Sequence, residues 1–564
     1  MLPIMDSMKK TDDELVKDII ARYQELKADR EQFVGRWKEA EQYVSSAVYD
    51  WTNIDAIPQV PTRYDSSPCQ RLKTLVAGLS GYSISPNIEW FKLNLEDQET
   101  LDLSGVKDWL EECERYMQAE FKRSRIYLEA STFIENAAVD GHAVMLIDED
   151  IERQRLRFTT MRNNEIYLDV NDSGEVDTVF REYYMTVRNA VKFFGEKNLD
   201  ESITEKYKDV KTWNDKIKII YAVYPREEYD ETIKDALNMP YAAVYVDPAH
   251  NKVIKEGGYN ELPYAVFQWE KINGYAYGNS PAISAMPDIK ALNIIRSSSL
   301  KIAQTSAEPP LVVPSSIRTV NLVPRGRTYV DDPTRDIIQP IKTGENYPIT
   351  LQVLDNYEQK VKDWFFVDFF LMLQSKQAQM TATEVMELQG EKSATLSSIV
   401  VALNDALNTI ILRSFNILLR ANRLPALPET LAGTDRNTLK IDFVGPLSQA
   451  QAKYHAAGGI SSALQLIGPI MELFPNSADY IDADKLMIRA MEGQGMPQAC
   501  IREEDEVEKL RTIRAQQAAQ QQAEAQRQNM LQNVMSNASN LGRAPEEGSI
   551  MSELNNQLRG GIGV

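Results

Sequence analysis

The residues that could bind a metal ion are concentrated in one acidic stretch, Asp169–Asp177. It supplies oxygen ligands at positions one, three, five, seven and nine of a calcium loop of EF-hand type, with Gly174 at position six. Position twelve, where such a loop needs a bidentate glutamate, is Phe180, and strands rather than helices are predicted on both sides. We therefore interpret the stretch as an acidic hairpin turn, with an adventitious calcium site as the alternative.

Catalytic chemistry has little support in the sequence. The chain of 564 residues has three histidines, and His142 opens a predicted strand, so we interpret it as structural rather than as an acid–base group. The patterns GxxxxGK(S/T), HExxH and paired CxxC do not occur. Cys69, Cys113 and Cys500 are odd in number and widely spaced, which favours neither a disulfide framework nor a zinc site. We expect no catalytic residue, no cofactor and no metal.

An aromatic cluster could stack on nucleic-acid bases. Its members are Trp364, Phe365, Phe366, Phe369 and Phe370. On a helix these side chains cover nearly the whole circumference, which favours burial between neighbouring helices or subunits. The lone Asp368 among them then needs a partner, for instance a basic group of an adjacent chain. The apolar run Trp364–Leu373 is about half the length of a bilayer span, so no membrane association is predicted.

Positive charge is concentrated locally in Arg318, Arg325 and Arg327, within a chain of net charge −20. They form either a solvated loop or a docking surface for an acidic partner. Lys376 lies in the short polar loop Gln374–Thr381 and is either simply exposed or able to touch phosphates transiently. The net charge argues against a protein that coats DNA, but not against one through which DNA slides.

The elements that would position these residues form an α+β chain that is mainly helical. Thr11–Glu14 is a capping box, and apolar residues recur at helical spacing through residue 49. Further helices are predicted over residues 71–79, 101–124 and 126–138. A largely antiparallel set of strands follows, over residues 142–148, 155–159, 165–170, 176–184, 218–224, 241–246 and 264–269.

The central stretch, residues 277–424, organises the rest of the chain. Ser280 and Pro281 predict the start of a helix that runs to about Ser306. A proline-rich excursion of strand and loop follows, because its prolines forbid a continuous helix. A second helix is predicted from Gln352 to Leu373, and a third follows the capping box Thr381–Glu384.

Beyond the central stretch, residues 438–443 are predicted as a strand, and residues 449–473 and 483–493 as helices. Residues 503–535 favour helix by propensity but lack an apolar stripe of their own, so such a helix needs neighbours.

Several motifs in a fixed order resemble the head-to-tail connector, or portal, proteins of short-tailed bacteriophages. They are Leu75–Leu79 with Pro86 and Trp90–Leu93, Tyr277–Ala282, Pro287–Asn293, Glu308–Pro314, Thr381–Val385, Ile417–Arg423 and Pro446–Gln451. Each motif is weak alone, but their order across residues 60–515 makes the match specific.

The resemblance implies a portal fold with an α/β wing, a two-helix stem, a clip between the stem helices, a tunnel loop and a helical crown and barrel. Carried onto this chain, the parts are the wing (residues 1–277), first stem helix (278–306), clip (307–351), second stem helix (352–373), tunnel loop (374–383), long helix and wing return (384–450), crown (451–502), and barrel helix with tail (503–564).

The implied function is that of a non-enzymatic ring, typically of twelve copies, at one capsid vertex. Double-stranded DNA is packaged and ejected through it without sequence-specific binding. The implied partners are the terminase large subunit, tail adaptor or nozzle proteins, major capsid and scaffolding proteins, and internal core proteins. The expected location is the virion, and the host cytoplasm during assembly. Gln374, Lys376, Gln377 and Gln379 become channel candidates, and the three arginines become clip docking candidates.

Two alternatives remain open at this point. A soluble oligomeric scaffold or adaptor would share the long helices and the lack of catalytic motifs. An enzyme with an unrecognised site would need a convergent cluster of titratable residues.

Overall fold

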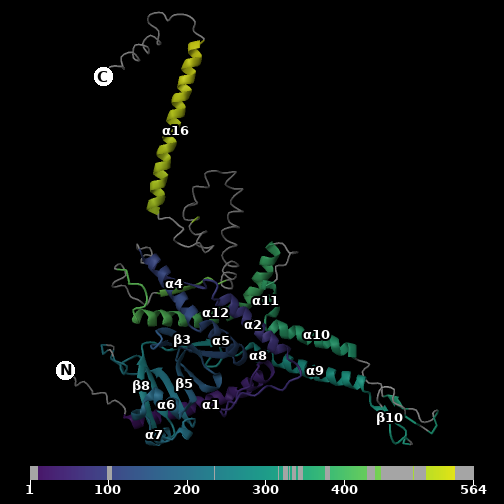
Figure 1. Ribbon diagram of the computed structural model, residues 1–564. Helices are drawn as coiled ribbons and strands as arrows, with labels where there is room; N and C mark the ends of the chain where they lie inside the picture. Colours follow the sequence, from purple (N-terminus) through teal and green to yellow (C-terminus); the bar gives the residue numbers. More distant parts are fainter. Residues whose placement is uncertain are drawn as a thin grey trace, which may run out of the picture. The chain divides into compact units, whose positions relative to one another are not determined.

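The computed structural model divides the chain into two compact units, Met1–Pro469 and Ile470–Val564 (Figure 1). The residues that it describes are 11–97, 105–230, 232–233, 235–315, 317–321, 328–329, 331–332, 334, 338–340, 347–374, 382–428, 439–445, 487 and 504–539.

Helices make up most of the described chain. The α-helices are α1 (Asp12–Val44), α2 (Ser67–Ser83), α4 (Val106–Arg123), α5 (Ile126–Asp140), α6 (Val187–Phe194), α7 (Glu201–Lys208), α8 (Pro281–Ser284), α9 (Met286–Ala307), α10 (Tyr347–Trp364), α11 (Val367–Gln374), α12 (Ala382–Arg420) and α16 (Glu504–Ser539). Short 3₁₀ turns are η1 (Asn163–Glu165), η2 (Glu196–Asn198) and η3 (Val210–Thr212).

The strands form antiparallel sheets, as the sequence predicts. They are β1 (Phe91–Leu95), β2 (His142–Asp150), β3 (Arg155–Thr160), β4 (Ile166–Val170), β5 (Val176–Thr186), β6 (Lys216–Pro225), β7 (Tyr241–Asp247), β8 (Lys252–Tyr259), β9 (Tyr264–Gln268), β10 (Leu311–Val312), β11 (Gln339–Pro340) and β12 (Leu439–Phe443). One sheet has the order β4-β5-β6-β7-β8 and another has the order β3-β2-β9. The mixed composition confirms an α+β chain.

Helices cover both faces of the five-stranded sheet, as the contacts of strand β6 show. Ile220 and Ala222 pack against the apolar stripe of α1, whereas Ile219 faces α6 and α7. Successive side chains of a strand point to opposite faces, so a strand buried on both sides reads as a continuous apolar run.

At the start of α1, Glu14 Oε2 accepts a hydrogen bond from the Thr11 backbone N–H at 3.1 Å, as the capping box predicts.

The three-stranded sheet lies in the largest apolar core, with α5 and α12 against it. Residues Leu396–Arg420 of α12 are long and apolar enough to cross a membrane by length and composition. Leu403, Leu407 and Ile410 are nevertheless fully buried in this core. Arg413 is also buried and donates a hydrogen bond from Nε to the Ile147 carbonyl of β2 at 2.9 Å. We therefore interpret α12 as a core helix.

The predicted strand near residues 438–443 is present as β12. It pairs with β1, with Phe91 opposite Phe443 and Leu95 opposite Leu439. This pairing brings the segment after α12 back to the segment after α2.

Several details differ from the sequence predictions. The helix predicted from Pro281 is interrupted at Ala285, because Pro287 has no N–H to continue the hydrogen-bond ladder. The second helix begins at Tyr347 rather than Gln352, and it is interrupted where Phe366 has φ +52°. Strands β1 and β8 and helices α6 and α7 were not predicted.

The second unit is described over α16, which confirms the helix predicted over residues 503–535. Its described side chains are almost all exposed, including Ile513 at 51% and Met530 at 72%. Such a helix gains little from burial within its own chain. The predicted helices at 449–473 and 483–493 lie outside the described residues, apart from Met487.

Candidate functional site

The segment Tyr277–Ala282 joins the sheets to the paired helices. Tyr277 is buried, its hydroxyl accepts a hydrogen bond from the Leu168 N–H at 3.2 Å, and its ring packs on Trp37. Ser280 Oγ donates to the Val139 carbonyl at 2.7 Å and accepts from the Ile283 N–H at 3.0 Å. The predicted N-cap therefore also anchors the helix to the end of α5.

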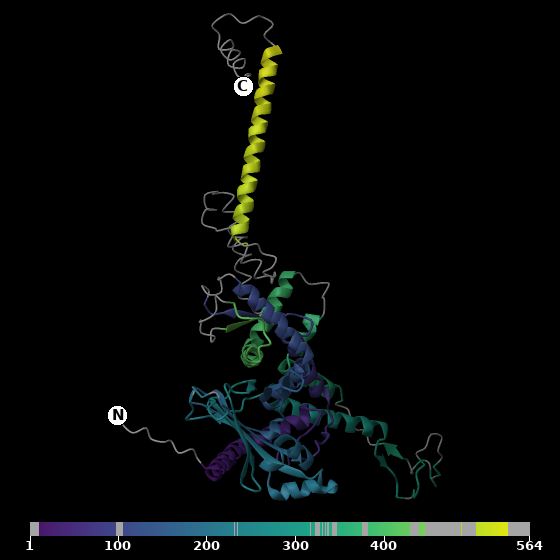
Figure 2. The same ribbon diagram turned by 60° about the vertical axis from the view of Figure 1, so that its left-hand side comes forward.

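Helices α9 and α10 run side by side and antiparallel, extending away from the sheets towards β10 (Figures 1 and 2). Arg296 of α9 forms ion pairs with Glu358 of α10 and, at 3.7 Å, with Asp65. Asp288 of α9 accepts a hydrogen bond from Trp364 Nε1 at 3.1 Å. Charged and polar contacts therefore hold α9 against α10 at two positions along the pair. The ion pair between Arg296 and Asp65 also connects α9 to the segment before α2.

The aromatic cluster Trp364–Phe370 is mainly buried, as predicted, with Phe365 and Phe370 fully enclosed. Phe366 is half-buried, and Trp364 is 42% exposed. Asp368 accepts a hydrogen bond from Gln359 Nε2 at 3.0 Å, so the chain itself provides a neutral amide as partner, and a basic group of an adjacent chain stays a prediction. A base-stacking platform is not supported, because the faces of the buried rings are occupied.

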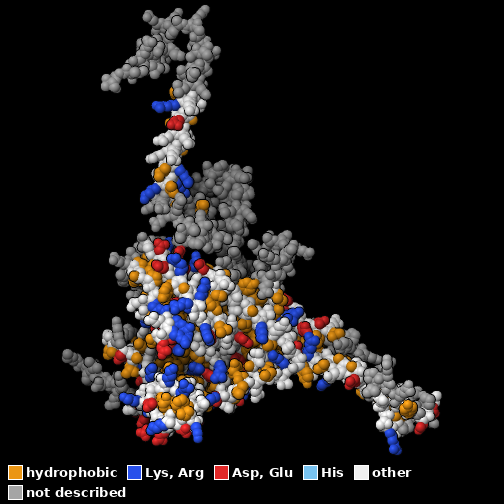
Figure 3. Space-filling model, in the orientation of Figure 1, with side chains coloured by type: hydrophobic (Ala, Val, Ile, Leu, Met, Phe, Trp, Pro, Cys, Tyr) orange, Lys and Arg blue, Asp and Glu red, His pale blue; other side chains and the backbone are white. Residues whose placement is uncertain are grey.

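The insert between α9 and α10 carries the short antiparallel pair β10 and β11, in agreement with the predicted excursion of strand and loop. Arg318 is exposed, and so are the apolar side chains of Val312 (56%) and Tyr329 (84%). Figure 3 shows apolar side chains at the end of this insert. Arg325 and Arg327 lie outside the described residues, so whether the three arginines form one surface stays a prediction.

The proposed channel residues are only partly described. Gln374 is the last residue of α11, whereas Lys376, Gln377 and Gln379 lie outside the described residues. Their lining of a channel stays a prediction.

His142 is structural, as interpreted from the sequence. It is fully buried between the rings of Trp37 and Tyr277, with centroid distances of 4.9 and 5.0 Å. Burial lowers the pKa of His142 to about 3. The imidazole is therefore neutral at physiological pH and enclosed by aromatic rings.

The acidic stretch Asp169–Asp177 forms the turn between β4 and β5, with Gly174 at φ +74°. Asp169 forms an ion pair with Arg22 at 3.2 Å, and Asn171 Oδ1 accepts the Glu175 N–H at 2.9 Å. These contacts within the chain engage two of the side chains that were considered as ligands. The predicted hairpin turn is confirmed.

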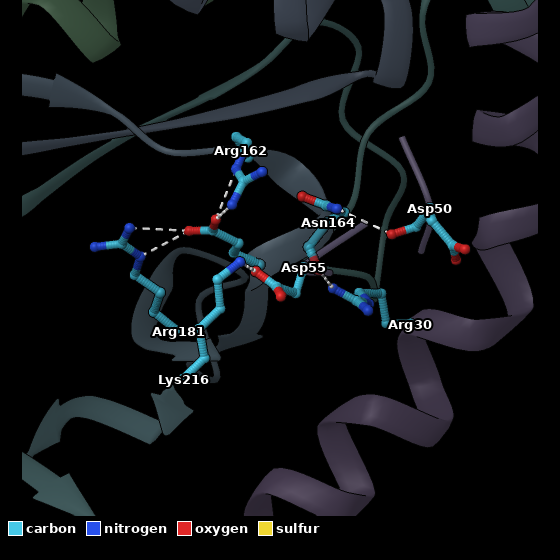
Figure 4. Close-up of polar contacts among 8 residues, drawn as sticks. Arg30, Asp50, Asp55, Arg162, Asn164, Arg181 and Lys216 are labelled. Carbon is cyan, nitrogen blue, oxygen red and sulfur yellow. Dashed lines mark hydrogen bonds and ion pairs between the residues drawn. The ribbon is translucent and has the colours of Figure 1, made fainter. Parts of the chain in front are cut away.

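A belt of polar contacts ties α1, the segment after it and the five-stranded sheet together (Figure 4). Arg30 Nη1 donates to the Asn164 carbonyl at 2.9 Å, and Asn164 Nδ2 donates to the Asp50 carbonyl at 3.0 Å. Arg162 and Arg181 both bind the carboxylate of Glu165. The partners in this belt are far apart in the sequence, so no local pattern predicts their contacts. The same holds for the nearby buried carboxylates of Glu41 and Asp140.

The comparisons with known proteins define the class first: this is a structural connector of bacteriophage particles. The chain belongs to the bacteriophage head to tail connecting protein family, whose model matches residues 16–501. It is 28% identical over 514 residues to the portal protein of Salmonella phage epsilon15, covering 89% of this chain and 91% of that protein. It is 27% identical over 512 residues to the probable portal protein of Bordetella phage BPP-1, with the same coverage.

These matches confirm the resemblance seen in the sequence motifs. Proteins of this family are components of the virion at the head–tail junction. The family match extends over most of the chain and supports a connector role at the head–tail junction.

Proposed function

We propose that the chain forms a ring of twelve copies at one vertex of the capsid, through which double-stranded DNA is packaged and later ejected. The observation that carries the proposal is the antiparallel pair α9 and α10, tied by Arg296 and Glu358 and interrupted by the insert that carries β10 and β11. In a connector family, such a pair with an insert at its far end suits a stem that carries a docking clip.

The assignment of the other parts follows the same order. Residues 1–277 form the wing, 307–351 the clip, 374–383 the tunnel loop, 451–502 the crown, and 503–564 the barrel helix and tail. Helix α16 supports the last assignment, because a long exposed helix without an apolar stripe is stabilised by neighbours, which copies in a ring provide.

Catalysis is left to partner proteins. Among the described residues no group of three or more His, Cys, Asp or Glu side chains is placed to hold a metal ion, and the buried histidine is enclosed by aromatic rings. In this proposal the terminase large subunit hydrolyses ATP, and the ring guides the DNA. The net charge of −20 suits passage rather than retention, since an acidic lumen repels phosphate.

The clip is proposed to dock the terminase first and the tail adaptor afterwards. Arg318, Arg325 and Arg327 would attract an acidic partner, mainly increasing the association rate and fixing orientation. The exposed Val312 and Tyr329 add apolar area to the proposed clip.

The test is depletion of this chain from the phage that encodes it, with supply from a plasmid. Heads made without the chain are expected to lack DNA and tails, and supply of the chain restores both. Filled, tailed particles formed without the chain would contradict the proposal.

A further inference from the structure

A small cavity of about 60 Å³ lies between α1, the end of α5 and the turn before β4. Glu41 of α1, Asp140 of α5, and Asn163 and Asn164 of η1 contribute to its wall. The volume exceeds the ~10–15 Å³ that one water requires. There is room for a small ion together with water.

Three oxygen atoms in this wall are buried without a hydrogen-bond donor among the described residues. They are Oδ1 of Asp140, Oδ1 of Asn163 and Oδ1 of Asn164, on side chains that are 5%, 5% and 2% exposed. Buried polar atoms are nearly always partnered by protein, water or an ion. The side chains that carry these three acceptors line the same cavity, which suits a hydrogen-bond donor or a cation as its occupant.

The other hydrogen bonds of Asp140 and Glu41 come from uncharged donors. Asp140 Oδ2 accepts a hydrogen bond from Asn163 Nδ2 at 2.8 Å, and Glu41 Oε2 accepts from the Tyr49 N–H at 2.8 Å. Neither carboxylate forms an ion pair with a basic side chain of the described residues. Arg162 also lines the cavity, but its guanidinium is bound to Glu165.

We propose that this cavity is a structural site for a hard divalent cation, with Glu41, Asp140, Asn163 and Asn164 as its protein ligands. Carboxylate and amide oxygens are the ligand set of Ca²⁺, and water can complete its six to eight positions, which makes Ca²⁺ a better fit than Mg²⁺. The site contains only two carboxylates. It is therefore not one of the groups of three or more His, Cys, Asp or Glu side chains considered above.

The bound cation would have a mechanical role. It would cross-link α1, α5 and η1 directly beside Gly141, which caps the C-terminus of α5 and adjoins the segment leading into α8 and α9. Burial raises the pKa of both carboxyls, that of Glu41 further because Asp140 is close, so a cation also offsets the cost of charging them.

The test uses Tb³⁺ as a luminescent probe of the full-length protein, excited through the nearby Tyr49 and Trp51. We expect sensitised emission that saturates at one ion per chain and is displaced by Ca²⁺. Saturating Ca²⁺ should raise the thermal midpoint by about 3 °C or more relative to EDTA. Absence of both effects in the wild-type chain would overturn the proposal, and this arm does not depend on any variant folding.

Variants then locate the site. Glu41→Gln and Asp140→Asn should each weaken Tb³⁺ binding by about tenfold or more, since affinity follows the ligand charge. Asp169→Asn in the acidic hairpin is the matched control and should leave binding unchanged. Binding that survives the Glu41→Gln/Asp140→Asn double variant but is lost in Asp169→Asn would assign the ion to the hairpin and refute this site.

Discussion

Gly141 and Gly278 touch backbone to backbone where the three-stranded sheet meets the segment leading into α8. A Cβ on Gly278 would lie 2.5 Å from the Gly141 carbonyl oxygen and 2.8 Å from that of Glu270. A Cβ on Gly141 would likewise overlap the Gly278 carbonyl, and Gly141 also has φ +87°. Glycine is required at both positions for steric reasons, and at Gly141 for conformational reasons as well.

Gly278→Ala is therefore expected to destabilise the chain by about 3 kcal/mol or more, at the upper end for overpacking, because backbone atoms cannot move aside as side chains do. Chemical denaturation measures the loss. The matched control is Gly35→Ala in α1, where a Cβ meets nothing within 4 Å and helix propensity predicts a gain of about 0.5–1 kcal/mol. Equal effects of the two substitutions would show that the Gly141–Gly278 contact is not tight.

Phe370 anchors α11 on α2. Its ring lies over Gly78, where a Cβ would come within 2.7 Å of the ring carbon Cε1, and the side chain is fully buried. Phe370→Ala should cost about 3–5 kcal/mol through lost burial and a cavity. Leu371→Ala, next to it but at a side chain that is 49% exposed, should change stability of the isolated chain by less than about 0.5 kcal/mol. Similar denaturation midpoints for the two variants would contradict the described packing.

Glu114 makes stability depend on pH. Its Oε1 accepts the Leu93 N–H at 2.6 Å, and burial raises the pKa of the carboxyl to about 7. Because the folded chain binds this proton more tightly than the unfolded chain, the stabilisation is complete below about pH 4.5. It is lost as the pH rises to 7 and beyond.

Glu114→Gln cannot ionise and its amide oxygen can still accept from Leu93. At pH 8 the variant should be more stable than the wild type by on the order of 1–3 kcal/mol, and the difference should shrink towards pH 5. Thermal midpoints measured across this range test the expectation. A gap that is independent of pH would show that Glu114 does not titrate in this window.

Lys376 tests the proposed tunnel loop. Lys376→Glu should impair DNA packaging or retention while ring assembly stays intact, because a ring of acidic side chains repels the phosphates that lysines would touch. Lys376→Arg keeps the charge and should package normally. The measured quantity is the amount of packaged DNA per head. Normal packaging by Lys376→Glu would contradict a role of the proposed tunnel loop in DNA passage.

Local signals explain what could be predicted from the sequence. The capping groups Thr11 and Glu14, and the Ser280–Pro281 start, act within one helical turn, so they were visible in the chain itself. The interruption at Phe366 was not, because an apolar run gives no local sign that one residue adopts φ +52°. Strand β8 was missed because Gly257 and Gly258 weaken its strand pattern.

Long-range contacts account for most of what remained out of reach. The motif Tyr277–Ala282 was recognisable, but the closeness of Gly278 to Gly141 follows only from the folded chain. Glu41 and Asp140 likewise belong to different helices, and nothing in their local sequence places them at one cavity. The pairing of α9 with α10 was expected from family order, whereas the Arg296–Glu358 contact was not.

The mass of the purified assembly, measured by native mass spectrometry with electron microscopy of the same sample, tests the central claim most directly. The account predicts a closed ring near twelve times 64.0 kDa with an axial hole wide enough for a DNA duplex. A compact dimer or tetramer without a pore would contradict it.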